Sequence, residues 1–406
     1  MIKKNILVIN CGSSSIKFSI INPINEKKIL TGITKHLKNK IYLIKWKINN
    51  INYKKKINKI NSNLEILKFI FTSIIIKNKK IFKNLFSIGH RIVHGGEHFS
   101  NSVIINDKVI NSIKDSIKFA PLHNSEHLIG IYKSFKYFPN FIKKNIAVFD
   151  TAFHQSIPKK FFLYALPYNL YKKYKIRKYG AHGISHKFIT LKTANILNKE
   201  IKNINIISCH LGNGCSISAI KNGKCIDTSM GLTPLEGLVM GTRCGDIDSS
   251  IIFYLYNFLG IKIDKINKIL NNESGLLGIS EISNDLKYIE KNYKNKKNFK
   301  LAIDIFCHRL SKYIGSYITL FNKNFDALVF TGGIGENSEL IRELTINSLN
   351  ILNFKIDKIL NKNIYYKKSG IITKFNSRLA LVIPSNEELI IAKDSYNIIN
   401  NNKFIN

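Results

Sequence analysis

MIKKNILVINCGSSSIKFSII, residues 1–21, is the stretch that decides the fold. The apolar run at residues 6–9 predicts a buried strand, and the alternating apolar residues at 16–20 predict a second strand. Residues 12–15, Gly-Ser-Ser-Ser, lie between the two strands and form a turn that is too small and polar to be chosen for packing. The sequence therefore predicts a tight hairpin at the start of the chain.

Asn10 and Lys17 flank this turn. A glycine- and serine-rich hairpin directs backbone N–H groups and hydroxyls at one point, with the Lys17 ammonium close by, and a terminal phosphate needs such donors. An ordinary Gly/Ser hairpin turn explains the same residues, so this segment alone leaves both interpretations open.

Two later segments repeat the arrangement. Residues 204–220 place an apolar strand, a Gly-Asn-Gly turn at 212–214 and an alternating strand in the same order. Residues 327–331 form a third apolar strand that runs into the glycines of 332–337, before a helical pattern begins. Glycines let a backbone approach phosphates closely, and the paired hairpins indicate an internal duplication. No P-loop and no strand–GxGxxG–helix unit is present, which excludes those two nucleotide-binding designs.

Composition sets broad limits on the function. A chain of 406 residues is long enough for two domains. The net charge of +37 would ordinarily suggest nucleic acid or an anionic membrane, but lysine, asparagine and isoleucine are over-used in every part of the chain, and the basic residues do not gather into one arm. We therefore expect neither nucleic acid nor a membrane as a partner. The longest apolar stretch, residues 64–76, contains Lys68 and is too short to span a bilayer.

The six cysteines show no C-x-x-C pair and no zinc spacing. Four of them lie in or beside the glycine turns and strands, where they act as small apolar fillers. We therefore expect reduced thiols and a cytoplasmic protein.

The remaining chain reads as alternating helices and strands. Residues 22–60 read as irregular strands and turns, 62–84 as a helix, 85–94 as a strand, 122–138 as a helix and 146–149 as a strand. The lysine run at 54–56 is expected in a surface loop or helix. A second half begins with a helical region at 181–199 and its own glycine hairpin.

A few charged residues stand in unusual surroundings. Arg91 follows His90 in an otherwise apolar strand, and Arg243 lies in the glycine-rich loop MGTRCGD. Solvated surface charge is the commonest role of an arginine, yet a chain that uses lysine almost everywhere retains the fork geometry of arginine here. Asp150 ends a buried strand, where it either caps the next turn or serves a reacting centre. Glu387 similarly reads as a favourable charge at a helix start or as a functional carboxylate.

Eight motifs, in order, closely resemble those of the acetate kinase family. They are NCGSSSIKF (10–18), GHRIVHGGE (89–97), VFDTAFHQ (148–155), YGAHGISH (179–186), HLGNG (210–214), GLTPLEGLVMGTRCGDID (231–248), TGGIGEN (331–337) and PSNEE (384–388). The resemblance is collinear from about Lys4 to the region of Asp394. It implies an α/β fold with two duplicated RNase H-like domains of the actin/hexokinase type around an interdomain cleft. We expect residues 1–150 with 386–406 to form the first domain and residues 151–385 to form the nucleotide-binding second domain.

The resemblance also implies a reaction and its residues. The reaction is reversible transfer of the ATP γ-phosphoryl group to acetate, giving acetyl phosphate and ADP, with magnesium for which manganese can substitute, in a homodimer. The implied catalytic residues are Asp150, His182, Arg243 and Arg91, and the implied acetate-binding residues are Arg91, Val93, Leu122 and Pro234. The implied nucleotide-binding residues are Lys17, His210, Leu211, Gly212, Asn213, Gly214, Asp285, Leu286, Lys287, Gly333, Ile334, Gly335, Glu336 and Asn337, and the implied metal-site residues are Asn10 and Glu387.

The chain departs from the family pattern at a few positions. Lys287 stands where an arginine is usual beside the nucleotide, Cys244 replaces a serine and Ser249 a proline. Ala181 stands where some relatives carry phenylalanine, which leaves acetate and propionate both open as substrates. A propionate kinase on the same scaffold is one alternative, and a non-catalytic nucleotide or sugar sensor of the same fold is another.

Overall fold

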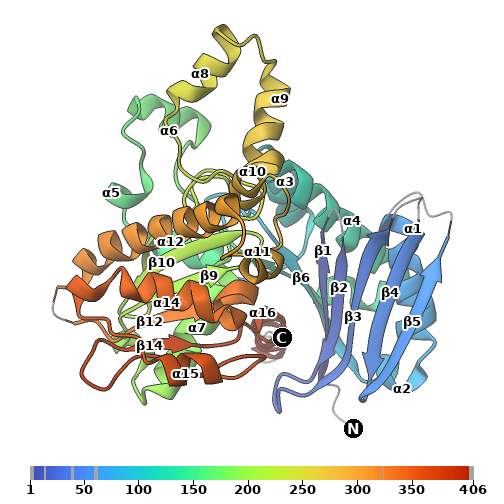
Figure 1. The fold of residues 1–406 in the computed structure, drawn as a ribbon. Helices are drawn as coiled ribbons and strands as arrows, with labels where there is room; N and C mark the ends of the chain where they lie inside the picture. The colour runs from blue at the N-terminus through green and yellow to red at the C-terminus, as the bar shows by residue number, and fades with distance from the viewer. Residues whose placement is uncertain (1–3, 13–14, 38–40, 59–62, 323, 402–406) are drawn as a thin grey trace. The chain divides into compact units, whose positions relative to one another are not determined.

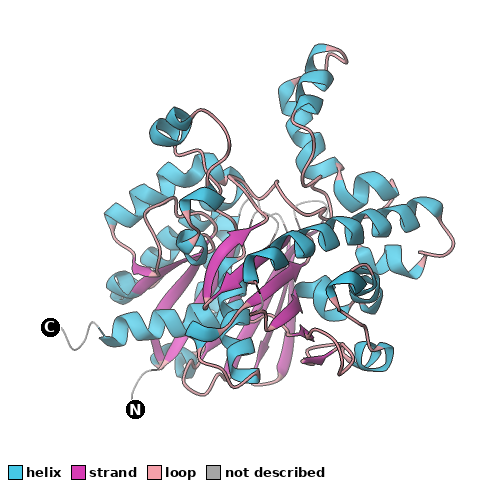
Figure 2. Ribbon diagram, turned by 90° about the vertical axis from the view of Figure 1, so that its left-hand side faces the viewer, coloured by secondary structure: helices cyan, strands magenta, loops and turns pink. Residues whose placement is uncertain are grey.

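The structure is a computed structural model that describes residues 4–12, 15–37, 41–58, 63–322 and 324–401. The middle of the predicted phosphate turn, Ser13 and Ser14, lies outside the described residues. The chain divides into two compact units, and helices and strands occur in both (Figures 1 and 2). Unit 1 comprises residues 1–155 and 386–406, and unit 2 comprises residues 156–385.

Unit 1 is built on a mixed sheet in the order β5-β4-β3-β2-β1-β6-β8-β7. Strands β1 to β5 form an antiparallel meander, whereas β6 and β8 run parallel to β1. The strands are β1 (Asn5–Cys11), β2 (Ile16–Ile21), β3 (Lys28–Leu37), β4 (Ile41–Ile48), β5 (Ile51–Ile57), β6 (Leu85–Ile92), β7 (Val103–Ile104) and β8 (Asn145–Phe149).

Helices cover both faces of this sheet. The hydroxyl of Ser134, in α4, lies 3.3 Å from Nε2 of His90, whereas a Cβ atom on Gly89 would collide with Ile391 and Ser395 of α16. Because successive side chains of a strand point to opposite faces, α4 and α16 pack on opposite sides of β6. The helices of unit 1 are α1 (Asn63–Phe69), η1 (Ile70–Ile76), α2 (Lys79–Lys83), α3 (Asp107–Asp115), η2 (Ser116–Phe119), α4 (Pro121–Tyr137), η3 (Pro139–Lys144) and α16 (Glu387–Asn401), and η4 (Ala152–Ser156) ends at the first residue of unit 2.

Unit 2 repeats the same topology. Its sheet has the order β11-β10-β9-β12-β14-β13, in which β9, β10 and β11 are an antiparallel meander and β12 and β14 run parallel to β9. This order matches β3-β2-β1-β6-β8 of unit 1 strand for strand. The predicted duplicated α/β fold with RNase H-like cores is thereby confirmed. The strands are β9 (Ile206–Leu211), β10 (Cys215–Lys221), β11 (Lys224–Thr228), β12 (Ala327–Thr331), β13 (Gly370–Ile371) and β14 (Ala380–Val382).

A long helix, α12 (Lys297–Ile318), lines the core of unit 2. It buries Phe299, Phe306 and Leu310 against the strands and the neighbouring helices, and the burial of such apolar side chains is the main source of folding free energy. The other helices are α5 (Lys159–Phe162), α6 (Tyr168–Tyr174), α7 (Gly183–Ile196), η5 (Ile201–Asn203), α8 (Ser250–Asn257), α9 (Ile263–Lys268), η6 (Ile269–Glu273), α10 (Gly275–Ser280), α11 (Leu286–Lys291), η7 (Thr319–Phe321), α13 (Gly332–Asn337), α14 (Glu339–Asn347), η8 (Asn350–Leu352) and α15 (Lys358–Asn363).

Several local expectations were wrong. Between residues 28 and 57 the described residues form three regular antiparallel strands, β3, β4 and β5, rather than irregular ones, and the lysine run at 54–56 lies in edge strand β5. The side chains of β5 are exposed on both faces except for Ile57, so the strand shows no apolar alternation to recognise. The expected single helix at 62–84 is interrupted at residues 77–78, where Asn78 caps α2 by accepting from the Ile81 N–H.

No helix in the described part of the chain is long and apolar enough to cross a membrane.

Candidate active site

In unit 1, three of the predicted site residues stand at the carboxyl ends of neighbouring parallel strands. Ile9 pairs with His90, which sets Asn10 of β1 beside Arg91 of β6. Arg91 pairs in turn with Val148 of β8, and the Asp150 N–H donates to the carbonyl of Ile92 at 2.8 Å. The carboxyl ends of parallel strands are where open α/β sheets bind ligands.

Arg91 and Asp150 form a forked ion pair. Nη2 of Arg91 donates to Oδ2 of Asp150 at 2.6 Å, and Nε donates to the same oxygen at 3.2 Å. Nη1 donates no hydrogen bond to any residue that the structure describes, and the Arg91 side chain keeps 19% of its surface exposed whereas Asp150 keeps 1%. One edge of the guanidinium is thus fixed by the protein and the other is open to a ligand.

Burial raises the pKa of Asp150 above its ordinary value, the Arg91 charge opposes that shift, and the Glu387 carboxylate adds to it. Burial lowers the pKa of Arg91, but Asp150 and Glu387 outweigh that effect and the net shift is upward. The guanidinium is therefore charged at any accessible pH, and the carboxylate depends on it to stay ionised.

Glu387, the first residue of α16, brings a second carboxylate to this place. Its Oε2 lies 3.9 Å from Nε of Arg91. The preceding residue, Asn386, has a buried Oδ1 with no hydrogen-bond partner among the described residues. A buried acceptor without a donor is costly and calls for a ligand or water.

The described residues contain no group of three or more histidines, cysteines, aspartates or glutamates that could hold a metal. The oxygen donors that the described residues offer here include the carboxylates of Asp150 and Glu387 and the amide oxygens of Asn10 and Asn386. That donor set suits magnesium, which keeps several waters and takes one or two protein carboxylates.

The predicted apolar pocket is only partly described. Val93 is buried, with 6% of its surface exposed. Leu122 lies in the first turn of α4, and its side chain lies outside what the structure describes. That end of α4 is held to the loop after β6, because the Asn124 side chain accepts from the His94 N–H at 3.1 Å and donates to the His94 carbonyl at 2.9 Å. Pro234 belongs to unit 2.

In unit 2, His182 lies in a histidine–serine cluster. It precedes α7 with a φ of +56°, which is unusual for a residue with a side chain. Its Nδ1 lies 3.0 Å from Oγ of Ser216, and its ring stacks on His210 with centroids 4.3 Å apart. His186 connects Ser216 and Ser208 through its two ring nitrogens, at 2.8 and 2.9 Å.

Sequence reasoning missed His186, Ser208 and Ser216 as supporting residues, whereas His210 was expected to bind the nucleotide. The available signal was the polar alternation Ser208, His210 in β9 and Ser216, Ser218 in β10, within strands that are otherwise apolar. Such alternation in buried strands marks polar groups that must find partners.

Arg243 lies beside this cluster. A Cβ atom placed on Gly214 would lie 3.5 Å from Cε1 of His182 and 3.6 Å from Nη1 of Arg243, so the three residues converge. Nη1 of Arg243 donates to the Pro234 carbonyl at 3.1 Å. Burial lowers the pKa of Arg243, but an arginine remains charged under any ordinary condition.

The loop that carries Arg243 is closed by Asp246. Its Oδ1 accepts from the Gly237 N–H at 2.7 Å, and its backbone N–H donates to the Gly237 carbonyl at 3.0 Å. Tyr313 donates to Oδ2 at 2.7 Å, and Arg309 lies 3.4 Å away. These contacts hold both ends of the segment between Gly237 and Asp246.

The predicted nucleotide-binding segments occupy three places in unit 2. In the turn at 212–214, the Gly212 N–H donates to the Gly214 carbonyl at 3.1 Å, and Asn213 accepts from the Gly241 N–H at 2.9 Å. Asn284 donates to the side chain of Asn213 at 3.3 Å, which brings the residues before α11 to this turn.

Two of the predicted nucleotide residues turn their side chains into the core. Leu211 and Leu286 are buried in the main apolar cluster of unit 2, with 0% and 5% of their surfaces exposed. The Asp285 carboxylate caps α11 by accepting from the Lys287 N–H at 3.0 Å. Contacts to a ligand from Leu211 and Leu286 would have to come from their backbones.

The glycines at 332–337 are helical and not the turn that we expected, because they form α13 directly after β12. Gly332 has a φ of +79°, and a Cβ atom there would lie 2.6 Å from the Leu211 carbonyl, so only glycine fits this junction. Arg342 of α14 is fully buried and donates to the carbonyls of Gly335 and Glu336 at 3.0 and 3.1 Å, which fixes the end of α13. Oε1 of Glu336 accepts from the Ser385 N–H at 2.9 Å.

Within unit 1 the structure thus brings Arg91, Asp150 and Glu387 together and sets Asn10 on the adjacent strand. Within unit 2 it brings His182, Gly214 and Arg243 together. The roles of all of these residues remain predictions.

The repeated sheet topology defines the class: a two-unit α/β protein with RNase H-like cores, of the actin/hexokinase type. The model of the acetokinase family matches residues 5–393. The chain belongs to the acetokinase family.

Individual relatives agree with this assignment. The acetate kinase of Wigglesworthia glossinidia brevipalpis is 58% identical over 390 residues, which are 96% of this chain and 98% of the relative. Among solved structures, a propionate kinase from Francisella tularensis subsp. tularensis SCHU S4 matches with a TM-score of 0.92 and 45% identity, covering 97% of this chain and all (100%) of that one. Porphyromonas gingivalis acetate kinase matches with a TM-score of 0.89 and 36% identity, covering 98% of this chain and 100% of that one.

Proposed function

We propose that this protein is an acetate kinase, a phosphotransferase that moves the ATP γ-phosphoryl group reversibly to acetate. Two lines support the proposal: the near-full-length relation to acetate kinases and the Arg91 guanidinium at the strand ends of unit 1. The second is the observation that carries the chemistry. Asp150 fixes the Nε and Nη2 side of Arg91, while Nη1 is unused by the described residues and can donate to a carboxylate substrate.

Acetate needs no general base, because its carboxylate is already ionised at neutral pH. Catalysis of phosphoryl transfer consists mainly of positioning and of neutralising charge on the phosphoryl oxygens. We assign acetate binding to Arg91, stabilisation of the transferring group to Arg243 and His182, and metal positioning to Asp150. The methyl group is assigned to Val93, Leu122 and Pro234.

Magnesium is assigned to Asn10 and Glu387, with the buried Oδ1 of Asn386 as a further oxygen nearby. When bound, the metal would supply charge neutralisation for the nucleotide phosphates. The oxygen-rich donor set fits this hard cation, and manganese is expected to substitute.

ATP and ADP are assigned to Lys17, to the turn at 210–214, to residues 285–287 and to residues 333–337. The exposed residues of these segments are Lys17, Asn213, Asp285, Lys287, Gly333 and Asn337. The Glu336 carboxylate already accepts from Ser385, so we expect its contribution to be positional and not direct.

Propionate kinase activity is the closest alternative, because a related structure carries that name. One methylene changes discrimination in an apolar pocket by about 1–3 kcal/mol. We expect propionate to be used roughly 10- to 200-fold less well than acetate in kcat/KM.

A hydroxamate assay with ATP, magnesium and acetate, propionate or butyrate distinguishes acetate kinase activity from propionate kinase activity. Acetate should give the highest kcat/KM, and Val93→Ile should reduce propionate use more than acetate use. A propionate value equal to or above that of acetate would make the enzyme a propionate kinase, and no product with any acid would favour a sensor of this fold.

We also propose a cytoplasmic homodimer. Helix α8 and the residues that follow it expose Phe253, Tyr254 and Phe258, with 64%, 55% and 77% of their surfaces accessible. Exposed apolar clusters of this kind typically mark protein interfaces. Light scattering at several concentrations, with Phe253→Ser/Phe258→Ser as the disrupting variant, tests whether α8 forms the contact.

A further inference from the structure

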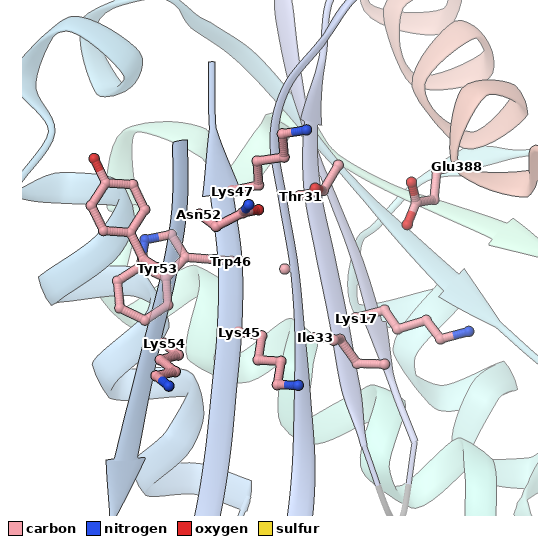
Figure 3. Close-up of a pocket in the computed structure, with 11 residues that line it drawn as sticks. Lys17, Thr31, Ile33, Lys45, Trp46, Lys47, Asn52, Tyr53, Lys54 and Glu388 are labelled. Atoms are coloured by element: carbon pink, nitrogen blue, oxygen red, sulfur yellow. The ribbon is translucent and has the colours of Figure 1, made fainter. Parts of the chain in front are cut away.

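Unit 1 contains an open cavity of about 690 Å³ outside the cluster of Arg91, Asp150 and Glu387 (Figure 3). Its floor is the part of the sheet formed by β2, β3, β4 and β5, and Glu388 at the start of α16 borders it. The volume lies in the range of small-molecule sites. Four of the residues that line it are lysines: Lys17, Lys45, Lys47 and Lys54.

Strand register places three of these lysines in one row. Lys17 pairs with Ile33, Ile33 pairs with Lys45, and Lys45 pairs with Lys54. Residues directly opposite one another on antiparallel strands share a face of the sheet. The row therefore crosses four strands on one face, and Lys47 stands in the next row opposite Asn52.

Among the described residues, the lysines on this face have no carboxylate partner. Like charges directly opposite one another destabilise a sheet, and Lys45 and Lys54 are such a pair. None of the four lysines forms an ion pair with a carboxylate in the described part of the chain, and the one glutamate that borders the cavity, Glu388, pairs with Lys28 at 2.8 Å. A multiply charged anion would relieve this repulsion.

The two aromatic side chains that border the cavity, Trp46 and Tyr53, do not face the lysine side. Trp46 and Tyr53 stack with ring centroids 5.4 Å apart. By strand alternation they point to the opposite face from Lys45 and Lys54, and Trp46 contacts Phe69 of α1 edge-on at 6.5 Å. Figure 3 shows both rings on the other side of the strands from Lys45 and Lys47. Trp46 and Tyr53 also line the cavity, but a ligand on the lysine face meets the ammonium groups and not the faces of these two rings.

We propose that this cavity binds a compact polyvalent anion, a phosphorylated or polycarboxylate small molecule, through the lysine row of Lys17, Lys45 and Lys54 with Lys47 beside it. The site is separate from the residues assigned to acetate and metal. It shares only Lys17 with those assigned to the nucleotide.

The test is isothermal titration of the full chain with inorganic tripolyphosphate and, separately, with citrate, at 0.15 M salt, where exposed charges farther apart than about 8 Å are screened. The site variant is Lys45→Gln/Lys54→Gln. The matched control is Lys35→Gln/Lys56→Gln, which removes the same charge from β3 and β5 of the same sheet. Lys35 and Lys56 both pair with Leu43, one row away from Lys45, and they do not line the cavity.

We expect the site variant to bind at least tenfold more weakly and the control less than twofold, with kcat for ATP and acetate unchanged in both. If only tripolyphosphate binds, the site recognises phosphate groups. If only citrate binds, it recognises carboxylates. If both bind, the site recognises negative charge in general. Equal losses in the two variants would show diffuse charge and overturn the proposal, as would a wild-type chain that binds neither anion. The kcat measurement, made separately, reports on the proposed function and not on this site.

Discussion

Arg91 and Asp150 are joined edge to edge, with Nη2 and Nε of the guanidinium donating to one carboxylate oxygen at 2.6 and 3.2 Å. They come from adjacent parallel strands, at the end of β6 and directly after β8. Because Asp150 is almost fully buried, its charge depends on this partner. The ion pair is therefore a fixed element of unit 1, and it holds the guanidinium of Arg91 in a position from which it can reach a substrate.

Replacing Arg91 with lysine keeps the charge and removes the fork. A lysine cannot hold Asp150 along one edge and present further donors to a carboxylate at the same time. We expect kcat/KM for acetate to fall by roughly a hundredfold or more, on the scale of a lost charge-assisted contact in the transition state. Steady-state kinetics with varied acetate and fixed ATP measure this.

The matched control is Arg378→Lys, since Arg378 belongs to unit 2 and lies over the ring of Phe325. Its kinetics should stay within twofold of the wild type. Near-normal acetate kinetics in Arg91→Lys would contradict the assigned role.

Arg243→Ala should lower kcat by roughly a thousandfold, comparable to the loss of an arginine that stabilises a phosphoryl-transfer transition state. The loop itself should persist, because Asp246 holds it through Gly237, Tyr313 and Arg309. Circular dichroism and thermal unfolding should therefore match the wild type. An equal loss of stability and activity would assign Arg243 a structural role instead.

The sequence predicted the parts of the site that reside in strand ends and glycine turns. Arg91 is recognisable because it stands in an apolar strand, and Asp150 because it directly follows one. Gly214 is recognisable because it lies in a glycine turn between two strands. What the sequence did not reveal depends on pairing between distant segments. Ser216 lies opposite His210 because β10 pairs with β9, and it meets His182, which comes from the separate segment before α7. The lysine row exists only because four strands share one register.

Leu211 and Leu286 illustrate a different limit. Both lie within motifs that resemble nucleotide-binding segments, yet their side chains pack in the core of unit 2. A motif predicts which segment of the chain binds a ligand, but the burial of each side chain decides which atoms of that segment can contact the ligand.

His90 should make folding stability depend on pH. It is buried, and its Nε2 lies 2.8 Å from Oδ1 of Asn145. Burial lowers the pKa of His90 to about 4, although the bond to Asn145 opposes that shift. Because the folded-state value lies below the unfolded one of about 6.5, this contribution is fully present above pH 6.5 and is lost as the pH falls towards 4.

The expected loss from His90 over that range is about 3 kcal/mol. Urea unfolding at pH 7 and pH 5 measures the slope, which His90→Gln should reduce. His127, whose pKa is also lowered by burial and by the charges of Arg91, His123 and His90, adds a loss of the same sign that the variant retains. An unchanged slope in the variant would show that the pKa of His90 is the same in the folded and unfolded protein.

Arg342→Met should destabilise unit 2. The fully buried guanidinium donates to the Asn361 side chain at 2.7 Å and to the carbonyls of Gly335, Glu336, Asn361 and Ile364. Leaving such acceptors unsatisfied costs about 1–3 kcal/mol each, so we expect a total of at least about 3 kcal/mol. Thermal unfolding with and without ADP measures it, and weaker stabilisation by ADP should accompany the loss because α13 is no longer fixed.

The most direct test of the account is ³¹P nuclear magnetic resonance of the purified wild-type chain with ATP, magnesium and acetate. We predict an acetyl phosphate signal that grows as the ATP γ-phosphate signal declines, and re-formation of ATP when ADP and acetyl phosphate are supplied instead. Release of inorganic phosphate without acetyl phosphate, or no turnover in either direction, would contradict the claim that this chain phosphorylates acetate.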